Sequence, residues 1–293
     1  MKESSRLLIA YDGSAYSDAA LNDLQRAGLP ATLEAVVLTA AYVFLPPKEG
    51  EMLSDDLVSP ATAVMVRPHQ LRAEGEVKKA LVLASQGAGR VKADFPGWSV
   101  RAEADGGTPA WSVIEMAGAL LVDLIVMGSH GHSSAGGRLI LGSVSQRVVY
   151  EAPCSVRVAR LSEKRREGPV RIVIGFNDSK DAEAAVDAVA SRSWPKGSEA
   201  RVITVGPPVK PEIQDAADER LRAAGLAAKQ VNREGNPAQV LIEEAENWDA
   251  DSIFVGTRNI HGIQHLLHGS VSLAVAAGAH CSVEVVRPGR SAP

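Results

Sequence analysis

Short, nearly continuous apolar runs alternate along the chain with segments in which apolar residues recur every three or four positions. Residues 7–11 and 121–127 are such runs, and they suit strands that are buried on both faces of a sheet. Regular alternation of strands and helices is typical of a doubly wound parallel sheet. The pattern predicts strands at residues 7–11, 33–43, 98–104, 121–127 and 155–159, and helices at residues 16–27, about 70–91, from 108 onward and at 143–150.

The sequence also repeats itself. Residues 6–14 match residues 171–179 without a gap, including Asp12 against Asn177. The other matches, in the same order, join residues 18–21 with 183–186, 107–110 with 235–238, 123–128 with 251–256, 142–145 with 269–272 and 154–158 with 281–285. Ordered matches of this kind indicate a tandem duplication. We therefore expect an α/β protein of two doubly wound, Rossmann-like domains at residues 1–161 and 169–293, joined by a charged linker at 162–168.

The first copy is the longer one. The offset between matching segments falls from 165 to 128 residues, so the first copy holds 37 extra residues, which fall between positions 44 and 94. Pro46, Pro47, Pro60 and Pro68 lie in this stretch, and we expect them to form a loop before the helix at about 70–91.

Composition narrows the range of functions. The chain has a formal net charge of -4, a mildly acidic pI of about 6.0 and two cysteines among 293 residues. This balance argues against a general nucleic-acid or membrane binder and favours a reduced, cytoplasmic setting. Residues 1–6 lack the apolar core of a signal peptide, and no stretch is long and apolar enough to span a membrane.

Two segments of the first copy follow strands and would meet at the ligand-binding edge of the sheet. Asp12 follows the first strand, and a glycine-rich segment from Gly128 to Ser143 follows the fourth. Glycines allow close backbone approach, and the start of the helix at Gly142-Ser143 offers N–H groups to a phosphate, with Arg138 as an added cation. Structural interpretations stay open: Asp12 as a turn residue, and Ser143 with Gln146 as a helix capping box.

Other chemistry finds less support. Residues 137–143 have the spacing of a Walker A phosphate loop but carry Ser143 where that motif needs a lysine. His261, His265 and His268 crowd the second glycine loop, but no nearby acid or cysteine completes a metal site, so solvated loop histidines are favoured. No nucleophile with a matching base is evident, so an enzyme is the least favoured class of function. At most, slow ATP hydrolysis is expected.

The residues at the sheet edge resemble the universal stress protein family. That family has an acidic residue after its first strand, a Gly-x-x-Gly-(nine residues)-Gly-Ser/Thr motif after its fourth and an Ala-Pro-Cys-like entry to its last strand. The matching residues here are Asp12, then Gly128, Gly131 and Gly142-Ser143, and then residues 152–156. The resemblance covers nearly the whole chain and implies the adenine nucleotide alpha hydrolase-like fold with bound ATP, with or without Mg²⁺. The nucleotide-binding residues it implies are, in the first copy, Asp12, Gly13, Ala40, Gly128, His130, Gly131, Arg138, Gly142, Ser143 and Val144, and in the second Asn177, Val205, Gly256, Asn259, Gly269 and Ser270.

The two copies depart from the family pattern differently. Ten residues rather than nine separate Gly131 from Gly142, whereas the second copy keeps nine but has Asn259 for a glycine and Asn177 for the acid. We expect the first copy to bind nucleotide better. The resemblance further implies a pseudo-dimer in which the last strands of the two copies pair antiparallel, because an open apolar edge would be exposed. The function expected is a nucleotide-sensing stress-response protein that acts on a protein partner and can form a further homodimer; the alternative is an interaction or scaffold module that has lost nucleotide binding.

Overall fold

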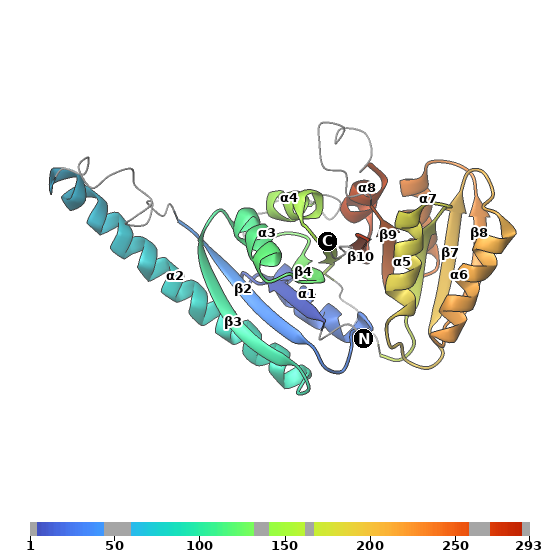
Figure 1. Cartoon of the computed structure of the whole chain (residues 1–293), viewed down its shortest axis with the longest axis horizontal. Coiled ribbons are helices and arrows are strands. Elements are labelled where there is room, and N and C mark those ends of the chain that lie inside the picture. The colour runs from blue at the N-terminus through green and yellow to red at the C-terminus, as the bar shows by residue number, and fades with distance from the viewer. Residues whose placement is uncertain (1–4, 44–59, 132–140, 162–166, 258–269, 289–293) are drawn as a thin grey trace.

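The computed structural model describes residues 5–43, 60–131, 141–161, 167–257 and 270–288, without the side chains of residues 60–70 and 270. Strands and helices alternate through both halves of the chain (Figure 1). The first half contains β1 (Arg6–Ala10), α1 (Ala15–Asp23), the 3₁₀ helix η1 (Leu24–Arg26), β2 (Glu34–Tyr42), α2 (Pro60–Asp94), β3 (Ser99–Gly107), α3 (Pro109–Ala119), β4 (Leu124–Gly128), α4 (Ser143–Glu151) and β5 (Ser155–Ala159). The second half contains β6 (Arg171–Phe176), α5 (Lys180–Ala190), β7 (Glu199–Val205), α6 (Pro211–Ala223), β8 (Ala227–Arg233), α7 (Pro237–Asn247), β9 (Ser252–Gly256), α8 (Ser270–Gly278) and β10 (Ser282–Val286).

The described strands form one continuous sheet in the order β3-β2-β1-β4-β5-β10-β9-β6-β7-β8. Within each half the neighbouring strands run parallel, as predicted. β1 lies between β2 and β4, and β6 lies between β7 and β9, so the order of strands reverses at these two places. In such sheets the crevice beyond the carboxyl ends at the reversal is where ligands bind.

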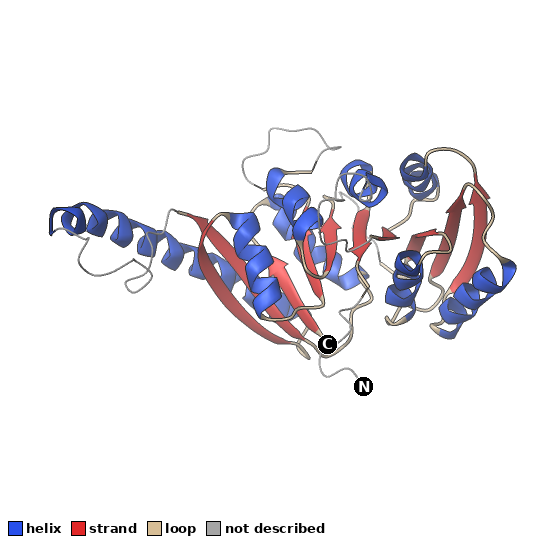
Figure 2. Cartoon of the chain, turned by 45° about the horizontal axis from the view of Figure 1, so that its top comes forward, coloured by secondary structure: helices blue, strands red, loops and turns tan. Residues whose placement is uncertain are grey.

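Helices cover both faces of the sheet (Figure 2). On one face, a single apolar core runs through both halves, with side chains from α3, α4, α7 and α8 packed on the strands. On the other face, α1 and α2 cover the first half and α5 and α6 cover the second, each pair over its own core. The continuous core on one face joins the two halves into one packed body.

Helix α2 differs from the prediction. It begins at Pro60, about ten residues before the predicted start, and its 35 residues include Pro60 and Pro68, both of which were expected in a loop. Proline is well tolerated at the first helical position because it has no N–H to leave unpaired, so Pro60 begins the helix. Pro46 and Pro47 lie outside the described residues.

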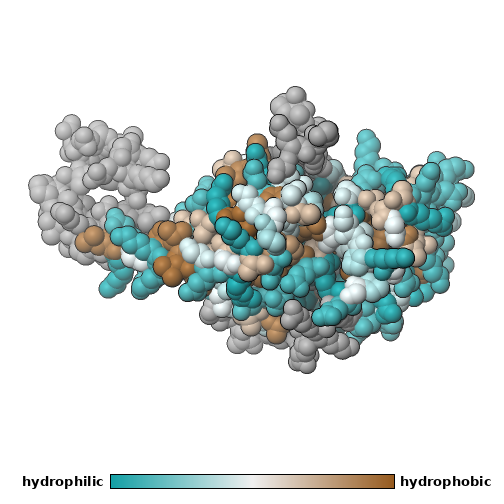
Figure 3. Space-filling model, turned by 90° about the horizontal axis from the view of Figure 1, so that it is seen from below, coloured by the Kyte–Doolittle hydropathy of each residue, from teal (hydrophilic) through white to brown (hydrophobic). Residues whose placement is uncertain are grey.

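The first turns of α2 extend beyond the sheet, so that the helix projects from the body of the molecule (Figure 1). Its side chains include the exposed apolar residues Leu71, Leu81 and Val82. Figure 3 shows brown apolar patches along the same projecting helix. In the described part of the second half, α6 takes the equivalent place and spans only Pro211–Ala223, without such an arm.

The predicted pairing of the last strands is confirmed. β5 and β10 run antiparallel at the centre of the sheet, with Val158 opposite Val283 and Arg157 opposite Glu284. Because positions 157 and 284 are equivalent in the duplication, a local twofold axis passes through this pair. Neither strand is therefore left as an open edge.

Buried charges reinforce the centre of the sheet. The side chain of Arg157 has no exposed surface; its Nε and Nη2 donate to Asp23 at 2.5 and 3.1 Å, and its Nη1 lies 3.5 Å from Glu284. Glu284 also accepts from Nη1 of Arg192 at 2.9 Å, and Arg192 donates to the carbonyl of Ala27. Four alternating charges from both halves thus balance each other in the interior.

Each half also caps a helix of the other. Arg160, directly after β5, donates from Nη2 to the carbonyls of Ala276 and Ala277 in the last turn of α8. Arg287, its equivalent after β10, donates from Nη2 to the carbonyl of Val149 at 2.6 Å, in the last turn of α4. Cations at a helix C-terminus satisfy free carbonyls and complement the helix dipole, so the two contacts fix the halves to each other reciprocally.

Within the described part of the chain, every helix falls short of the length and apolar character needed to cross a bilayer.

Candidate functional site

Asp12 lies two residues after the end of β1 and is held by Ser14. Its Oδ1 accepts from the backbone N–H of Ser14 at 3.0 Å and from the Ser14 hydroxyl at 2.6 Å. The Ser14 hydroxyl also caps α1 by accepting from the N–H of Ser17. Gly13 between them has φ +74°, a conformation that glycine adopts without strain. The turn interpretation of Asp12 is therefore correct, and the turn fixes the direction of the carboxylate.

The glycines of the first half bring separate backbones into contact. A Cβ placed on Gly131 would lie 2.8 Å from Oδ2 of Asp12, so the loop after β4 passes directly beside that carboxylate. A Cβ on Gly128 would lie 2.6 Å from the Tyr16 carbonyl, which shows how closely α1 approaches the end of β4. On Gly142 it would lie 3.3 Å from Cα of His130. These close approaches, rather than a need for flexibility, explain why glycine occupies the three positions.

The structure excludes the capping-box interpretation of the start of α4. Gly142, not Ser143, is the N-cap residue, and glycine has no side chain to accept from the first turn, so Ser143 and Gln146 do not form a capping box. Gly142 has φ −60°, so it needs no positive φ. Its N–H donates to the carbonyl of Ser129 at 2.9 Å, which holds the start of α4 against the loop that follows β4. The Ser143 side chain is thereby left at the helix start, where a ligand can reach it.

His130 is part of a small buried cluster at the same edge. Its Nδ1 lies 3.1 Å from the Ser129 hydroxyl, and its ring packs on Tyr16 with 4.9 Å between ring centroids. Burial, followed by the charge of Arg160, lowers the pKa of His130 from its ordinary value of 6.5. The imidazole is therefore neutral at neutral pH, suited to hydrogen bonding rather than to charge pairing with an anion.

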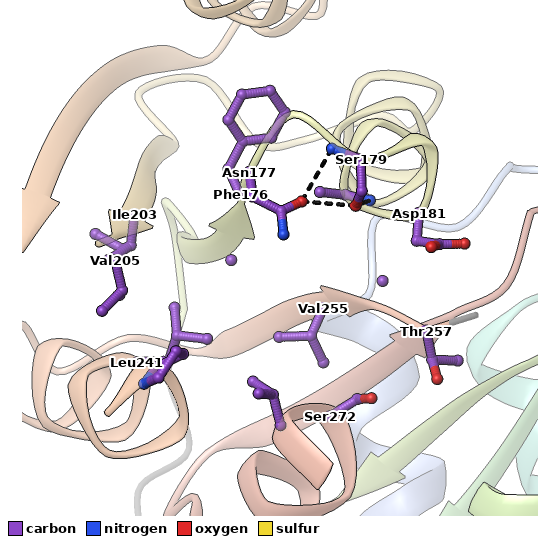
Figure 4. A pocket seen from close by; sticks show the side chains of 15 residues that line it. Phe176, Asn177, Ser179, Asp181, Ile203, Val205, Leu241, Val255, Thr257 and Ser272 are labelled. Atoms are coloured by element: carbon purple, nitrogen blue, oxygen red, sulfur yellow. Dashed lines mark hydrogen bonds between the residues drawn. The ribbon is translucent and has the colours of Figure 1, made fainter. Parts of the chain in front are cut away.

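The second half contains a cavity of about 300 Å³ at the equivalent edge (Figure 4). Apolar side chains from β7, α7 and β9 form one part of its wall, among them Ile203, Leu241 and Val255. The polar part comes from the turn after β6 and from the start of α8. The lining residues are Gly175, Phe176, Asn177, Ser179, Asp181, Ala182, Ile203, Val205, Pro237, Leu241, Val255, Gly256, Thr257, Val271 and Ser272.

Asn177 repeats the geometry of Asp12. Its Oδ1 accepts from the N–H of Ser179 at 3.1 Å and from the Ser179 hydroxyl at 2.6 Å (Figure 4). Ser179 in turn caps α5, as Ser14 caps α1. A backbone N–H can only donate, so the atom facing it must be the amide oxygen, and the amide nitrogen takes the place of Oδ2.

The structure brings several predicted residues together. In the first half Asp12, Gly131 and Gly142 meet through the loop after β4; Ala40 lies near the carboxyl end of β2, and Val144 is in the first turn of α4. In the second half Asn177, Val205 and Gly256 line one cavity. Arg138, Asn259 and Gly269 lie outside the described residues, as do His261, His265 and His268, and the side chain of Ser270 is not described.

Sequence reasoning missed the serines that orient these groups. Ser14 and Ser179 stand two residues after the acid and the amide, the spacing of an Asx turn, so the signal was present in both copies. Ser145 was missed too; its hydroxyl donates to the carbonyl of Gly128 at 2.9 Å and ties α4 to the end of β4.

Metal and thiol chemistry receive no support from the described residues. Among them, no three His, Cys, Asp or Glu side chains gather as a metal site would require. Both cysteines are free thiols, and burial raises the pKa of Cys281 to about 12. That thiol stays protonated at neutral pH and is a poor nucleophile.

Comparison with known proteins places this geometry in context. A universal stress protein of Mycolicibacterium smegmatis is 27% identical over 309 residues, covering 96% of this chain and 97% of that protein. A universal stress protein of Thermus aquaticus is 31% identical over 133 residues, covering 40% of this chain and 97% of that one. The crystal structure of a universal stress protein from Archaeoglobus fulgidus shares the fold, with a TM-score of 0.65, 22% identity and coverage of 97% and 99%.

The family assignment rests on a match to each half. The model of the universal stress protein family matches residues 3–160 and, separately, residues 170–287. These two segments include Asp12 and Asn177, each with its turn, and the β4 and β9 glycines Gly128 and Gly256. The chain therefore belongs to the universal stress protein family and carries two copies of its fold in tandem.

Proposed function

We propose that this protein binds adenine nucleotides at the carboxyl ends of the strands in each half, with ATP as the nucleotide it senses in a stress-response role. The observation that best supports this is the second-half cavity, where Asn177, Val205 and Gly256 come together although they are far apart in sequence. These are three of the positions that the family resemblance assigns to a nucleotide. The proposal extends to the first half because the turn at Asp12 has the same geometry.

The two ends of the cavity suit the two ends of a nucleotide, the base and the phosphates. Apolar side chains of Ile203, Val205 and Leu241 stand at one end and can enclose a purine by dispersion contacts (Figure 4). At the other end lies the start of α8, and the first-turn N–H groups and the dipole of a helix favour the negative charge of phosphates. A volume of about 300 Å³ lies at the lower limit of small-ligand pockets, enough for a nucleoside with its phosphates directed outward.

Binding without turnover follows from the side chains present. Among the described residues that line the cavity there is one carboxylate, Asp181, and neither a histidine nor a lysine. Such a wall offers little for activating a water, so bound ATP is expected to persist. Mg²⁺ that arrives with ATP would be held mainly by phosphate oxygens and water, the coordination this ion prefers.

We expect the first half to bind more tightly. It retains the carboxylate of Asp12 and the glycines Gly131 and Gly142, whereas the second half carries Asn177 and Asn259. A nucleotide bound in either half would contact the loop that follows β4 or β9, and these loops lead into α4 and α8. Since Arg160 and Arg287 join those two helices to the opposite halves, they offer a route by which binding could alter a surface that a partner protein reads.

The test uses the full chain. Protein purified without added nucleotide is denatured and its released small molecules are identified by chromatography, and titration calorimetry then measures ATP, ADP, AMP and GTP with and without Mg²⁺. We expect adenine nucleotides to bind with up to two equivalents per chain, and ATP to remain intact over the titration. GTP serves as the matched ligand of equal charge.

An absence of binding at millimolar ATP, with no co-purified nucleotide, would instead support the interaction or scaffold module. Release of ADP at a rate proportional to protein concentration would contradict the sensing role while leaving nucleotide binding in place.

A further inference from the structure

The two outermost strands of the sheet differ in charge. Among the described strands, β3 ends the sheet on one side and β8 ends it on the other. β8 carries Lys229 and Arg233 and no acidic residue, so a second copy of β8 offers these cations no partner, a common protection of an edge strand against association. β3 carries Arg101, Glu103 and Asp105, which are charges of both signs. Of the two strands, β3 alone can complement a second copy of itself.

The backbone of β3 is oriented for pairing on its outer side. The N–H of Ser99 donates to the carbonyl of Leu33 at 2.9 Å, so the backbone groups of Ser99 face β2. The N–H and C=O of one residue point to the same side of a strand, and the side alternates along the chain. Val100, Ala102 and Ala104 therefore direct their backbone groups away from β2. Such a row of outward N–H and C=O groups is a template for another strand.

Charge selects one register for two antiparallel copies of β3. With a twofold axis at Ala102, Arg101 of each copy lies opposite Glu103 of the other. Moving the axis by one residue sets Arg101 or Glu103 opposite its own copy, and moving it by two residues in either direction removes both attractive pairs. Arg101 and Glu103 share one face of the strand, with Nε and Oε1 3.3 Å apart, and their side chains are 53% and 43% exposed. Both side chains can therefore reach a neighbouring strand.

Helix α2 adds an apolar flank beside the same edge. Its buried residues Ala80 and Ala84 face the sheet, over β2 and β3. Leu83 flanks this buried stripe on the side of Gly13, where a Cβ would lie 3.0 Å from its Cδ1, so Leu81 flanks it on the side of the β3 edge. The Leu81 side chain is 44% exposed there. A helix over β2 and β3 lies about one strand spacing from the proposed axis, so two α2 helices would be about 10 Å apart, close to the distance at which helices pack.

We propose that two chains associate through β3, so that their sheets join into one and their α2 helices lie side by side on one face of it. The contact of β5 with β10 inside the chain has the same form, with antiparallel strands around a local twofold axis and Arg157 opposite Glu284. In this arrangement the projecting arm of each α2 (Figure 1) points toward the amino end of the partner's β3. The association involves no nucleotide, so it stands or fails separately from the proposed function.

Reversing charges on β3 tests the proposal, with sedimentation equilibrium of the full chain as the measurement over a wide range of protein concentration. We expect the wild type to dimerise. Glu103→Arg and Arg101→Glu each set like charges opposite one another twice in the dimer, and each should raise its dissociation constant at least about tenfold. The double variant Arg101→Glu/Glu103→Arg restores opposite charges and should restore the dimer. Lys229→Glu, the matched reversal on β8, should leave the dissociation constant unchanged.

Leu81→Glu provides a second test on a different element, and it should weaken the dimer as well because it places a charge on the flank of α2. Matched thermal melting curves establish that each variant is folded. A wild type that is monomeric at every concentration overturns the proposal, as does a double variant that dimerises no better than the single ones. Oligomers larger than a dimer, or a loss of association in Lys229→Glu, would assign the contact to β8 and overturn it too.

Discussion

Replacing Glu284 with alanine should destabilise the protein strongly, because its carboxylate balances two buried arginines. Only 1% of the Glu284 side chain is exposed, and it accepts from Nη1 and Nη2 of Arg192 and lies 3.5 Å from Nη1 of Arg157. Removing one member of a buried ion network costs about 3–5 kcal/mol, because the remaining charge is left without compensation. Since Arg157 keeps both of its bonds to Asp23, we expect the lower part of that range, about 3 kcal/mol.

Urea unfolding followed by tryptophan fluorescence and by circular dichroism measures this loss. The change in the unfolding midpoint, multiplied by the m-value, gives the change in the free energy of unfolding. Glu151→Ala provides the matched control. Glu151 pairs with Arg147 at 3.2 Å one helical turn away, but that arginine side chain is 51% exposed, and such surface pairs contribute about 0.5 kcal/mol or less.

The reasoning would be refuted if Glu284→Ala lowered stability by no more than the control. That result would mean that Arg157 and Arg192 find water or other partners at little cost, and that the central charges do not hold the halves together. A Glu284→Gln variant separates charge from packing. It keeps the volume and one acceptor oxygen, so a loss close to that of alanine assigns the effect to the charge.

Three further predictions concern the sheet edge. Gly142→Val should abolish nucleotide binding in the first half, measured by calorimetry, because its side chain would meet the backbone of His130; Gly118→Val, at a site with open space, should retain binding. Gly256→Ala should lower the urea midpoint by an amount equivalent to about 1–3 kcal/mol, because the added Cβ would lie 2.0 Å from the Asp181 carbonyl; unchanged stability would mean that α5 can move away freely. Because the pKa of His130 is lowered in the folded protein, the unfolded chain takes up a proton first as the pH falls. The free energy of unfolding should therefore fall as the pH drops below 6.5 toward the lowered pKa. His130→Gln should flatten this part of the stability profile, measured from about pH 7.5 to 5.5.

The order of elements was predictable because each apolar run is short and clearly bounded. β5 spans Ser155–Ala159, the predicted range, since turn residues precede it and charged residues follow it. β3 instead continues through Asp105, Gly106 and Gly107, which have low strand propensity. They remain extended because the long strand β2 pairs with them as far as Tyr42 opposite Gly107. Pairing of this kind depends on the tertiary structure and leaves little trace in a local pattern.

The candidate site was predictable in outline and not in detail. The duplication indicated Asp12 and Asn177 as equivalent positions, and the structure gives them the same turn. The roles of the glycines were harder to foresee, because a glycine in a sequence does not show which backbone it approaches; Gly142 has φ −60° and lies against the backbone of His130. The charged residues at the centre carried no signal at all, since Arg157 sits in an alternating strand pattern that is equally typical of a solvated face.

The antiparallel contact of β5 with β10 has a consequence for how such a molecule can diverge. When two identical subunits meet across a twofold axis, the residue on the axis faces its own copy, so an arginine there must oppose an arginine. One chain that holds both halves is free of this constraint, and here Arg157 faces Glu284. The other two members of the charge network also lack an equivalent: Ala188 corresponds to Asp23, the partner of Arg157, and Ala27 corresponds to Arg192, the partner of Glu284. Fusion into one chain thus allows an asymmetric contact, in which each half is complementary to the other half rather than to a second copy of itself.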